Sequence, residues 1–282
     1  NNDIFIWLSK PTDFRGQKIE DFSVNLESDS EYIDKGNVIH YFKPFGQNIK
    51  LKVEIEAVLS CQNISDEMVI FTKLPKEVSD RYLKSEKYLE QTQEVIELTK
   101  KITDGIKTPK EKVKAIFKYI AESFTYHYPV KERGVIHLDL NNLTGDCAEH
   151  SSLFVTMCRI SGIAARNVTG FVIFEKEKHI IEHGWAQVYC NDKWLDVDTQ
   201  FASLEKNIDI GMKKYLYGRS DYRIIFSTGF DIELKPHIPK DFTIDTVRNL
   251  EIIVDSKSTQ VLQPLVFASK GKVDFKDNII LE

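Results

Sequence analysis

The first part of the chain contains a stretch in which apolar and charged residues alternate. In LKVEIEAVL (residues 51–59) an apolar side chain occupies every second position. This period of two is typical of a half-buried β-strand. Strands are also predicted for NVIHYF (residues 37–42) and EMVIFTKL (residues 67–74), with turn residues between them. The N-terminal part is therefore predicted to form a small β-sandwich or sheet.

From residue 83 the apolar residues recur at helical spacing instead. The first helix is predicted over residues 83–102, with Gly105 as its C-terminal cap. A second helix is predicted from Thr108, the N-cap, with Pro109 in the first helical position and Glu111 closing a capping box. One apolar stripe follows along this helix: Val113, Ile116, Phe117 and Ile120.

A third helix is predicted between a capped start and a glycine stop. Asp146 precedes Glu149 by three residues, a capping-box spacing with aspartate as the N-cap, and Ser161-Gly162 ends the helix. This assignment places Cys147 in the first helical turn. Apolar residues cover nearly the whole circumference, which predicts a central, buried helix: Leu153, Phe154, Val155, Met157, Cys158 and Ile160.

Strands are predicted next in ARNVTGFVIF (residues 165–174), HGWAQVYC (residues 183–190) and KWLDVDTQF (residues 193–201). If Asn191-Asp192 is a two-residue hairpin turn, Cys190 lies opposite Lys193, and one face of the hairpin is apolar. The other face then sets His183, Trp185, Gln187 and Tyr189 across from Gln200, Asp198, Asp196 and Trp194. Further strands are predicted in YRIIFSTGF (residues 222–230), LEIIVD (residues 250–255) and QVLQPLVFAS (residues 260–269).

Length and composition indicate a globular protein. The 282 residues allow one large domain or two ordinary ones, and 42% hydrophobic residues can form a substantial core. The net charge of -5 arises from basic and acidic residues spread along the chain, which argues against nucleic-acid and anionic-membrane partners. No apolar run approaches the roughly 20 residues of a transmembrane helix. The chain does not begin with Met, which fits either a trimmed fragment or a mature exported form, and the sequence leaves both open.

The four cysteines form no CxxC pair and no dense framework, so neither a disulfide scaffold nor a structural zinc site is predicted. His150 and His179 could join His183 and Cys147 as metal ligands, but they show no recognised ligand spacing. We therefore predict no metal and no cofactor. Cys158 and Cys190 fall on apolar faces and are interpreted as small core residues.

Cys147 is the candidate nucleophile. Unpaired N–H groups and the positive end of the dipole at a helix N-terminus favour a thiolate, and a nearby imidazole held by a carboxylate would complete a catalytic set. The hairpin register sets Asp198 diagonal to His183, at roughly 7 Å between Cβ atoms. Asp196 lies farther along the same face. Provided that the turn has an even number of residues, the geometry selects Asp198 as the orienting acid.

GDCAEHSSLFVTMCRISGIAARNVTGF followed by HGWAQVYCNDKWLDVD resembles the transglutaminase-like superfamily. The resemblance covers about residues 80–236 and implies a papain-like core with Cys147 as nucleophile, His183 as base and Asp198 as orienting acid. One departure is that Thr199-Gln200 stands where the family often has Pro-Thr. The resulting prediction is an α+β protein with a β-rich N-terminal region (1–78), a transglutaminase-like catalytic core (79–236) and a C-terminal β-rich extension (237–282).

The resemblance implies a thiol-dependent acyl-transfer enzyme. A cysteine protease or amidase acting on peptide or glutamine-type amide bonds is the first hypothesis, with a peptide or protein as substrate. A transglutaminase that passes the acyl group to an amine, and a non-catalytic binding module that keeps the fold, are the alternatives. Trp185, Gln187 and Trp194 are the candidate substrate-cleft residues, although the two tryptophans equally fit a role in covering one side of the hairpin.

Overall fold

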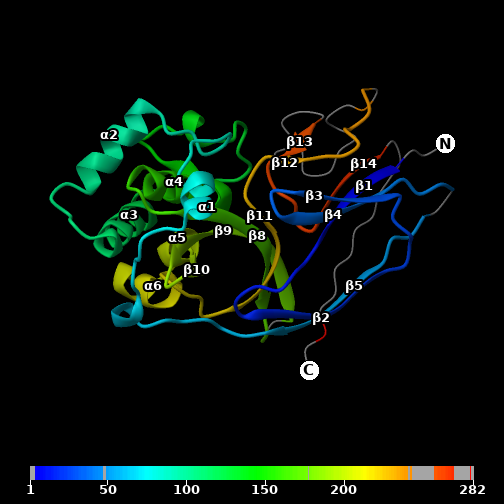
Figure 1. Ribbon diagram of the computed structural model, residues 1–282, viewed down its shortest axis with the longest axis horizontal. Helices are drawn as coiled ribbons and strands as arrows, with labels where there is room; N and C mark the ends of the chain where they lie inside the picture. Colours follow the sequence, from blue (N-terminus) through cyan, green and yellow to red (C-terminus); the bar gives the residue numbers. More distant parts are fainter. Residues whose placement is uncertain are drawn as a thin grey trace. The chain divides into compact units, whose positions relative to one another are not determined.

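The computed structural model describes residues 4–46, 49–176, 178–240, 242, 257–269 and 280. These residues form helices and strands in an α+β arrangement, as predicted (Figure 1). The chain divides into two compact units that are each discontinuous in sequence. The strand-rich unit comprises Asn1–Ser60, Thr169–His183 and Asp221–Glu282, and the helical unit comprises Cys61–Val168 and Gly184–Ser220. The domain boundaries predicted at 78/79 and 236/237 do not include this interleaving and stay a prediction.

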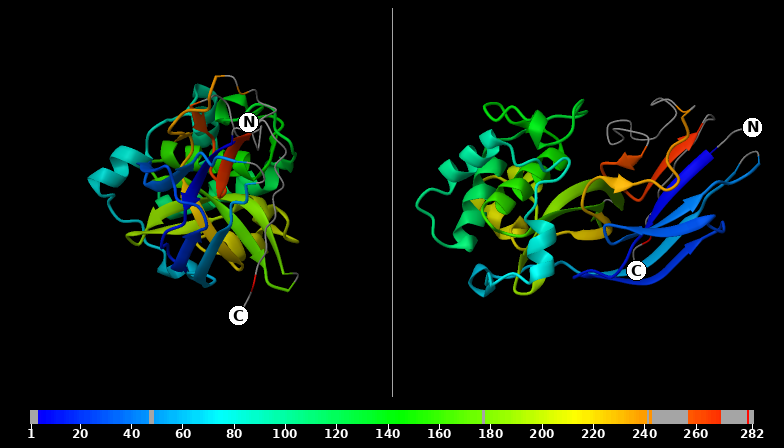
Figure 2. Two further views of the ribbon diagram at one scale, coloured as in Figure 1. Left: turned by 90° about the vertical axis from the view of Figure 1, so that its right-hand side faces the viewer. Right: turned by 45° about the horizontal axis from the view of Figure 1, so that its top comes forward.

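The strand-rich unit contains a four-stranded sheet of order β14-β1-β4-β3 (Figure 2). Its strands are β1 (Ile4–Lys10), β3 (Ser30–Asp34), β4 (Asn37–Phe42) and β14 (Leu265–Ser269). A core cluster of Ile6, Leu8, Phe42 and Leu265 forms between these strands because their alternate side chains share one face. The predicted strands at residues 37–42 and 260–269 are therefore present, the second in shorter form.

A separate pair of strands, β2 (Gln17–Val24) and β5 (Val53–Leu59), shows the alternation that the sequence predicted, since half-buried and exposed residues alternate along β5. β12 (Ile232–Glu233) pairs with β13 (Ser258–Thr259). β11 (Tyr222–Thr228) lies within the predicted segment 222–230 and contributes Ile224 and Phe226 to a second core cluster with Phe171. The strand predicted in LEIIVD lies outside the described residues.

The helical unit is built around α4 (Cys147–Ile160), which packs against α2 (Gln93–Ile102), α3 (Pro109–Ser123) and α5 (Thr199–Ser203) (Figure 1). α1 (Lys76–Tyr82) and α6 (Ile208–Tyr215) complete its helices among the described residues. Every residue of α4 from Glu149 to Arg159 is buried, which confirms the predicted central helix. The predicted apolar stripe of α3 is fully buried as well.

One predicted helix is shorter than expected, and one predicted strand is wrong. The helix expected over residues 83–102 begins only at Gln93, because Thr92 caps it by accepting from the Val95 N–H and Tyr88 adopts a positive φ of 71° that a helix excludes. The strand expected over residues 67–74 does not form. A short 3₁₀ helix, η1 (Asp66–Met68), begins there, and Ile70 exchanges hydrogen bonds with Asn191 instead of entering a ladder.

Three long strands follow α4: β8 (Ala165–Phe174), β9 (His179–Cys190) and β10 (Lys193–Val197), in a sheet of order β10-β9-β8-β11. The register sets Lys193 opposite Cys190 and Val197 opposite Ala186, as the two-residue turn predicted. Asn191 and Asp192 both have φ of 54°, the left-handed values that a tight hairpin turn requires.

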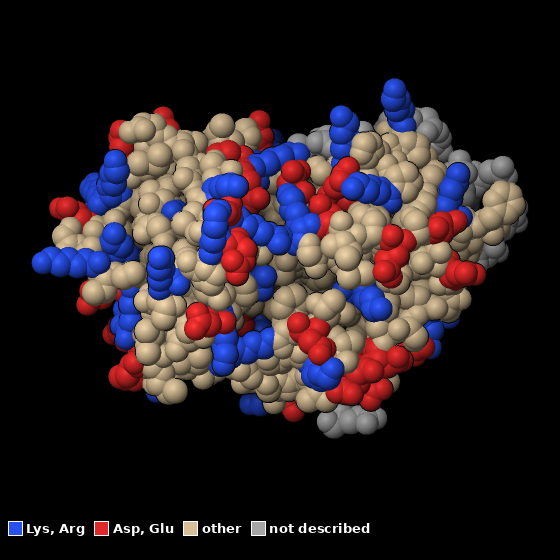
Figure 3. All heavy atoms as spheres, viewed as in Figure 1, with Lys and Arg blue, Asp and Glu red and all other residues tan. Residues whose placement is uncertain are grey.

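Two short strands, β6 (Thr125–Tyr126) and β7 (Thr144–Gly145), pair in parallel and lead into α4, and a 3₁₀ turn, η2 (Val135–His137), lies between them in sequence. Among the described residues, the search for a helix with the length and apolarity needed to span a bilayer found none. Acidic and basic side chains are interspersed over the face of the molecule shown in Figure 3.

Candidate active site

Cys147 is the first residue of α4. The Asp146 carboxylate accepts a hydrogen bond from the Ala148 N–H at 2.8 Å, and the Glu149 carboxylate accepts one from the Asp146 N–H at 3.4 Å. The predicted capping box is thus confirmed. Gly145 is needed before it, because a Cβ at this position would lie 2.5 Å from the Glu149 Cβ. The Gly-Asp-Cys sequence therefore fixes where the helix starts and which residue begins it.

Both capping carboxylates are held by Arg133, a residue that the sequence analysis missed. Arg133 Nη2 lies 2.8 Å from Asp146 Oδ2, and Nη1 lies 2.6 Å from Glu149 Oε2. The three side chains are 3%, 7% and 1% exposed. Arg133 lies in the segment between β6 and η2, where no hydrophobic period indicates its partner. The one available signal was the pair Asp146 and Glu149. Two acidic residues at the start of a buried helix need a buried cation.

The structure does not give the predicted stabilisation of a Cys147 thiolate. Burial, followed by the negative charges of Asp146, Glu149 and Asp198, raises the pKa of the Cys147 thiol, and a hydrogen bond from the Gly184 N–H to its sulfur opposes this only in part. The direction is opposite to the prediction, first because the sulfur is buried and second because acidic side chains already occupy the helix N-terminus. These causes favour the thiol over the thiolate at Cys147.

His183 lies on β9, immediately before the residue that contacts Cys147. Its side chain is buried, and its carbonyl accepts a hydrogen bond from Gln263 Nε2 at 2.8 Å. Because the Gly184 N–H donates to the Cys147 sulfur, the β9 backbone passes the sulfur one residue after His183. The histidine predicted as the base is thus adjacent in sequence to a residue that contacts the predicted nucleophile.

Asp198 follows the last residue of β10. One carboxylate oxygen caps α5 by accepting from the Phe201 N–H at 2.9 Å, and the side chain is buried. Its charge raises the pKa of Cys147, so the two residues lie within electrostatic reach of each other. Thr199 occupies the first position of α5, where proline also fits well, which accounts for the departure from the family's usual Pro.

Asp196, the neighbouring candidate acid, is held in a buried polar cluster. Its Oδ1 accepts from Trp185 Nε1 at 2.8 Å and from Gln187 Nε2 at 2.9 Å, and its Oδ2 lies 2.7 Å from Arg219 Nη1. Arg166 donates to Gln187 Oε1 and stacks on the Trp194 ring at 4.3 Å. With its oxygens held in this way, Asp196 supports the hairpin.

The cleft candidates differ in exposure. Trp185 is 1% exposed and Gln187 is 3% exposed, so neither side chain presents a surface to a substrate. Their burial favours the alternative, a role in covering and supporting the hairpin. Trp194 is partly exposed, with Arg166 against one face of its ring, and stays a candidate for contact with a substrate.

Tyr126 is a second residue near Cys147 that the sequence analysis missed. It pairs with Gly145 in the β6–β7 ladder and is 54% exposed. Burial of part of the ring, together with the charge of Asp146, raises the pKa of Tyr126. The exposed phenol therefore lies on β6, whose partner strand β7 ends two residues before Cys147. A two-residue strand is too short for a period of two to reveal it.

Among the residues that the structure describes, no three His, Cys, Asp or Glu side chains gather as metal ligands. His150, considered as a ligand from the sequence, is buried with its ring 4.2 Å from that of Phe124.

Comparison with known proteins identifies the fold of this region. Residues 96–199 match the family model of the transglutaminase-like superfamily. The predicted resemblance is confirmed. The match includes Cys147, His183 and Asp198 within its bounds. A comparison with curated protein sequences found no match.

Solved structures with a similar fold include a candidate cysteine protease from Cytophaga hutchinsonii, with 15% sequence identity, a TM-score of 0.59, and coverage of 99% of this chain and 89% of that one. The periplasmic domain of TgpA from Pseudomonas aeruginosa aligns at 16% identity with a TM-score of 0.42, covering 73% of this chain and 72% of its own. Red sea bream transglutaminase aligns at 10% identity with a TM-score of 0.30, covering 71% and 45%. At such identities the first similarity establishes the fold alone.

Breaking the Arg133 bridge should destabilise the protein strongly. Arg133→Leu leaves Asp146 and Glu149 buried without a counter-charge, and we expect the free energy of unfolding to fall by about 3–5 kcal/mol. Urea unfolding measures it. Lys76→Leu, which removes the exposed ion pair with Asp80 on α1, is the matched control and should leave stability nearly unchanged. Equal effects of the two changes would contradict the structural role of Arg133.

Proposed function

We propose that this protein is a cysteine hydrolase that cleaves peptide or glutamine-type amide bonds, with Cys147 as nucleophile, His183 as general base and acid, and Asp198 as orienting acid. The observation that carries the proposal is the contact between the Cys147 sulfur, at the start of a capped buried helix, and the Gly184 N–H on β9, the residue after His183.

The raised pKa of Cys147 determines the first step that we propose. Because burial and nearby acidic groups disfavour the thiolate, we propose that His183 takes the proton of the thiol as the sulfur attacks the carbonyl carbon of the amide. The carbonyl oxygen becomes an oxyanion, for which the Cys147 backbone N–H is our candidate donor, because the first N–H groups of a helix lack intrahelical partners. Collapse of this intermediate breaks the C–N bond as His183 returns the proton to the leaving amine.

Water completes the cycle. His183 removes a proton from water as its oxygen attacks the thioester carbonyl. The C–S bond then breaks to release the acid, and His183 returns the proton to the sulfur, which regenerates the thiol. Asp198 keeps the imidazole in the tautomer and orientation that both proton transfers need. Selectivity for an amine in place of water would need a site that excludes water and positions a neutral amine, and the sequence contains no motif for one.

Product analysis with added amine distinguishes the hydrolase from the alternatives. With a glutamine-containing peptide and a primary amine at millimolar concentration, we expect most acyl groups to be transferred to water, as measured by mass spectrometry of the products. Predominant amine adducts would favour a transglutaminase. Absence of turnover across varied peptides would favour the non-catalytic module.

A further inference from the structure

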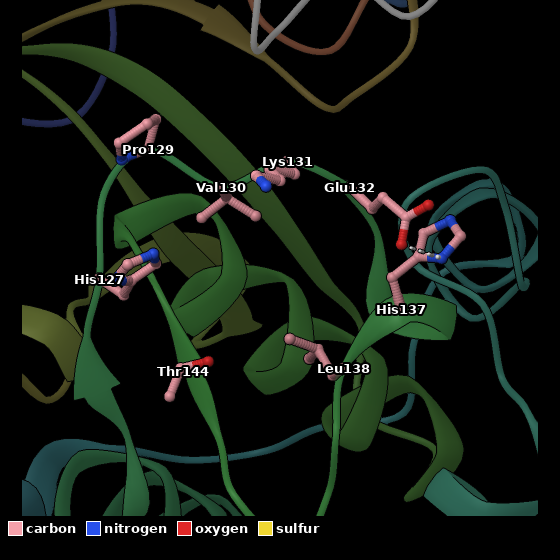
Figure 4. Close-up of a pocket in the computed structure, with 8 residues that line it drawn as sticks. All are labelled: His127, Pro129, Val130, Lys131, Glu132, His137, Leu138 and Thr144. Carbon is pink, nitrogen blue, oxygen red and sulfur yellow. Dashed lines mark ion pairs between the residues drawn. The ribbon is translucent and has the colours of Figure 1, made fainter.

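A cavity of about 430 Å³ lies beside the start of α4, between the segment 127–138 and Thr144 of β7 (Figure 4). This volume lies within the range of cavities that bind small ligands or one or two residues of a peptide. In Figure 4, His127 and Thr144 lie together at one end of the cavity, and Glu132 faces His137 at the other. Among the described residues, the cavity lining includes none of the proposed catalytic residues.

The cavity is close to Cys147. Thr144 precedes Cys147 by three residues, which limits their Cα separation to at most about 11 Å. The lining segment 127–138 is also tied to both sides of Cys147, since Arg133 bridges Asp146 and Glu149. An extended peptide rises about 3.3 Å per residue, so we expect a substrate residue that contacts the Thr144 end of the cavity to lie within about three positions of the attacked carbonyl.

The lining groups favour a negatively charged side chain. Lys131 forms no ion pair with any residue that the structure describes, so its ammonium group is available to a ligand. The His127 imidazole and the Thr144 hydroxyl add hydrogen-bond donors at one end. Pro129, Val130 and Leu138 supply apolar walls for the methylene groups of a side chain.

Three acidic groups lie nearby. Arg133 bridges Asp146 and Glu149, and burial raises the pKa of Glu149 to about 8, so the single positive charge of Arg133 balances Asp146 near neutral pH. Glu132 lines the cavity beside His137, and because 77% of its side chain is exposed, solvent screens its charge. The remaining positive charge at the cavity is that of Lys131. A carboxylate there gains a charge-assisted hydrogen bond, whereas a neutral amide of the same shape does not.

We propose that this cavity is a specificity subsite that binds an aspartate or glutamate side chain of the peptide substrate through Lys131, His127 and Thr144. The proposal rests on the proposed hydrolase function, since it assigns the cavity to the same substrate. It predicts a preference for an acidic residue at one position within three residues of the cleaved bond.

Matched peptides that differ only by Glu or Gln at each such position test the subsite. At one position we expect kcat/KM to be about tenfold higher for Glu, as one charge-assisted hydrogen bond implies. Lys131→Gln should bring the ratio of kcat/KM for the Glu and Gln peptides close to one. Lys131→Glu should reverse the preference, so that a peptide with Lys at the same position becomes the better substrate. Lys118→Gln, at an exposed position of α3, is the control and should keep the wild-type ratio.

A binding measurement separates failure of the subsite from failure of the proposed function. In Cys147→Ala, calorimetry should show about tenfold tighter binding of the Glu peptide than of the Gln peptide, and Lys131→Gln in that background should remove the difference. Equal binding of the two peptides, or an unchanged preference in Lys131→Gln, overturns the subsite whether or not the wild type turns over. If the Glu peptide binds more tightly than the Gln peptide but the wild type shows no turnover, the subsite is supported and the hydrolase proposal is overturned.

Discussion

Cys147→Ala is expected to abolish amide hydrolysis, with kcat falling on the order of 10⁴-fold or more. The sulfur is the only group in the proposed mechanism that forms a bond to the substrate, so no other residue can replace it. Steady-state kinetics on a cleavable fluorogenic peptide measure the loss. The fold should be retained, because the Asp146–Glu149–Arg133 capping arrangement does not include the Cys147 side chain.

Cys61→Ala is the matched control for this change, because Cys61 is exposed and also carries a free thiol. It should keep wild-type turnover. Cys147→Ala activity within tenfold of the wild type, in a preparation with the wild-type unfolding midpoint, would exclude Cys147 as the nucleophile.

Asp198→Asn is expected to lower kcat by about 10³- to 10⁴-fold while leaving the fold nearly intact. An asparagine oxygen can still accept from the Phe201 N–H and cap α5, so the cap survives the change. The amide cannot stabilise a protonated His183, and it favours the wrong imidazole tautomer. Kinetics and thermal unfolding measured on the same preparation separate the two effects.

Asp196→Asn is the matched comparison, because it makes the same chemical change two residues away. It removes the charge that faces the buried Arg219, so we expect a large loss of stability, about 3–5 kcal/mol, with kcat of the folded protein reduced less than tenfold. The reversed pattern, with Asp196→Asn inactive and Asp198→Asn active, would mean that the acid was assigned to the wrong strand position.

The register of the β9–β10 hairpin could be predicted because two local signals agreed. Asn191-Asp192 tolerates the left-handed backbone of a two-residue turn, and the apolar alternation on both strands fits one pairing only. The start of α4 was equally predictable, since its cap, its glycine and its apolar circumference all lie within one short segment. Local chemistry was sufficient in both cases.

The remaining features depend on contacts between residues distant in sequence. Ile70 exchanges hydrogen bonds with Asn191, a hairpin-turn residue 121 positions away, so its apolar neighbours falsely predicted a strand. Arg133 contacts the carboxyl groups of Asp146 and Glu149 through tertiary packing of the segment after β6. The direction of the Cys147 pKa shift depends on burial and on Asp198, neither of which the helix N-terminus alone reveals.

The most direct test of the account is to trap the acyl-enzyme. A slowly hydrolysed peptide ester is mixed with the wild type, quenched in acid within the first turnover, and digested for tandem mass spectrometry. We expect the peptide acyl group on the Cys147 sulfur, and its absence from that position in Cys147→Ala. An acyl group on any other side chain, together with turnover that persists in Cys147→Ala, would contradict it.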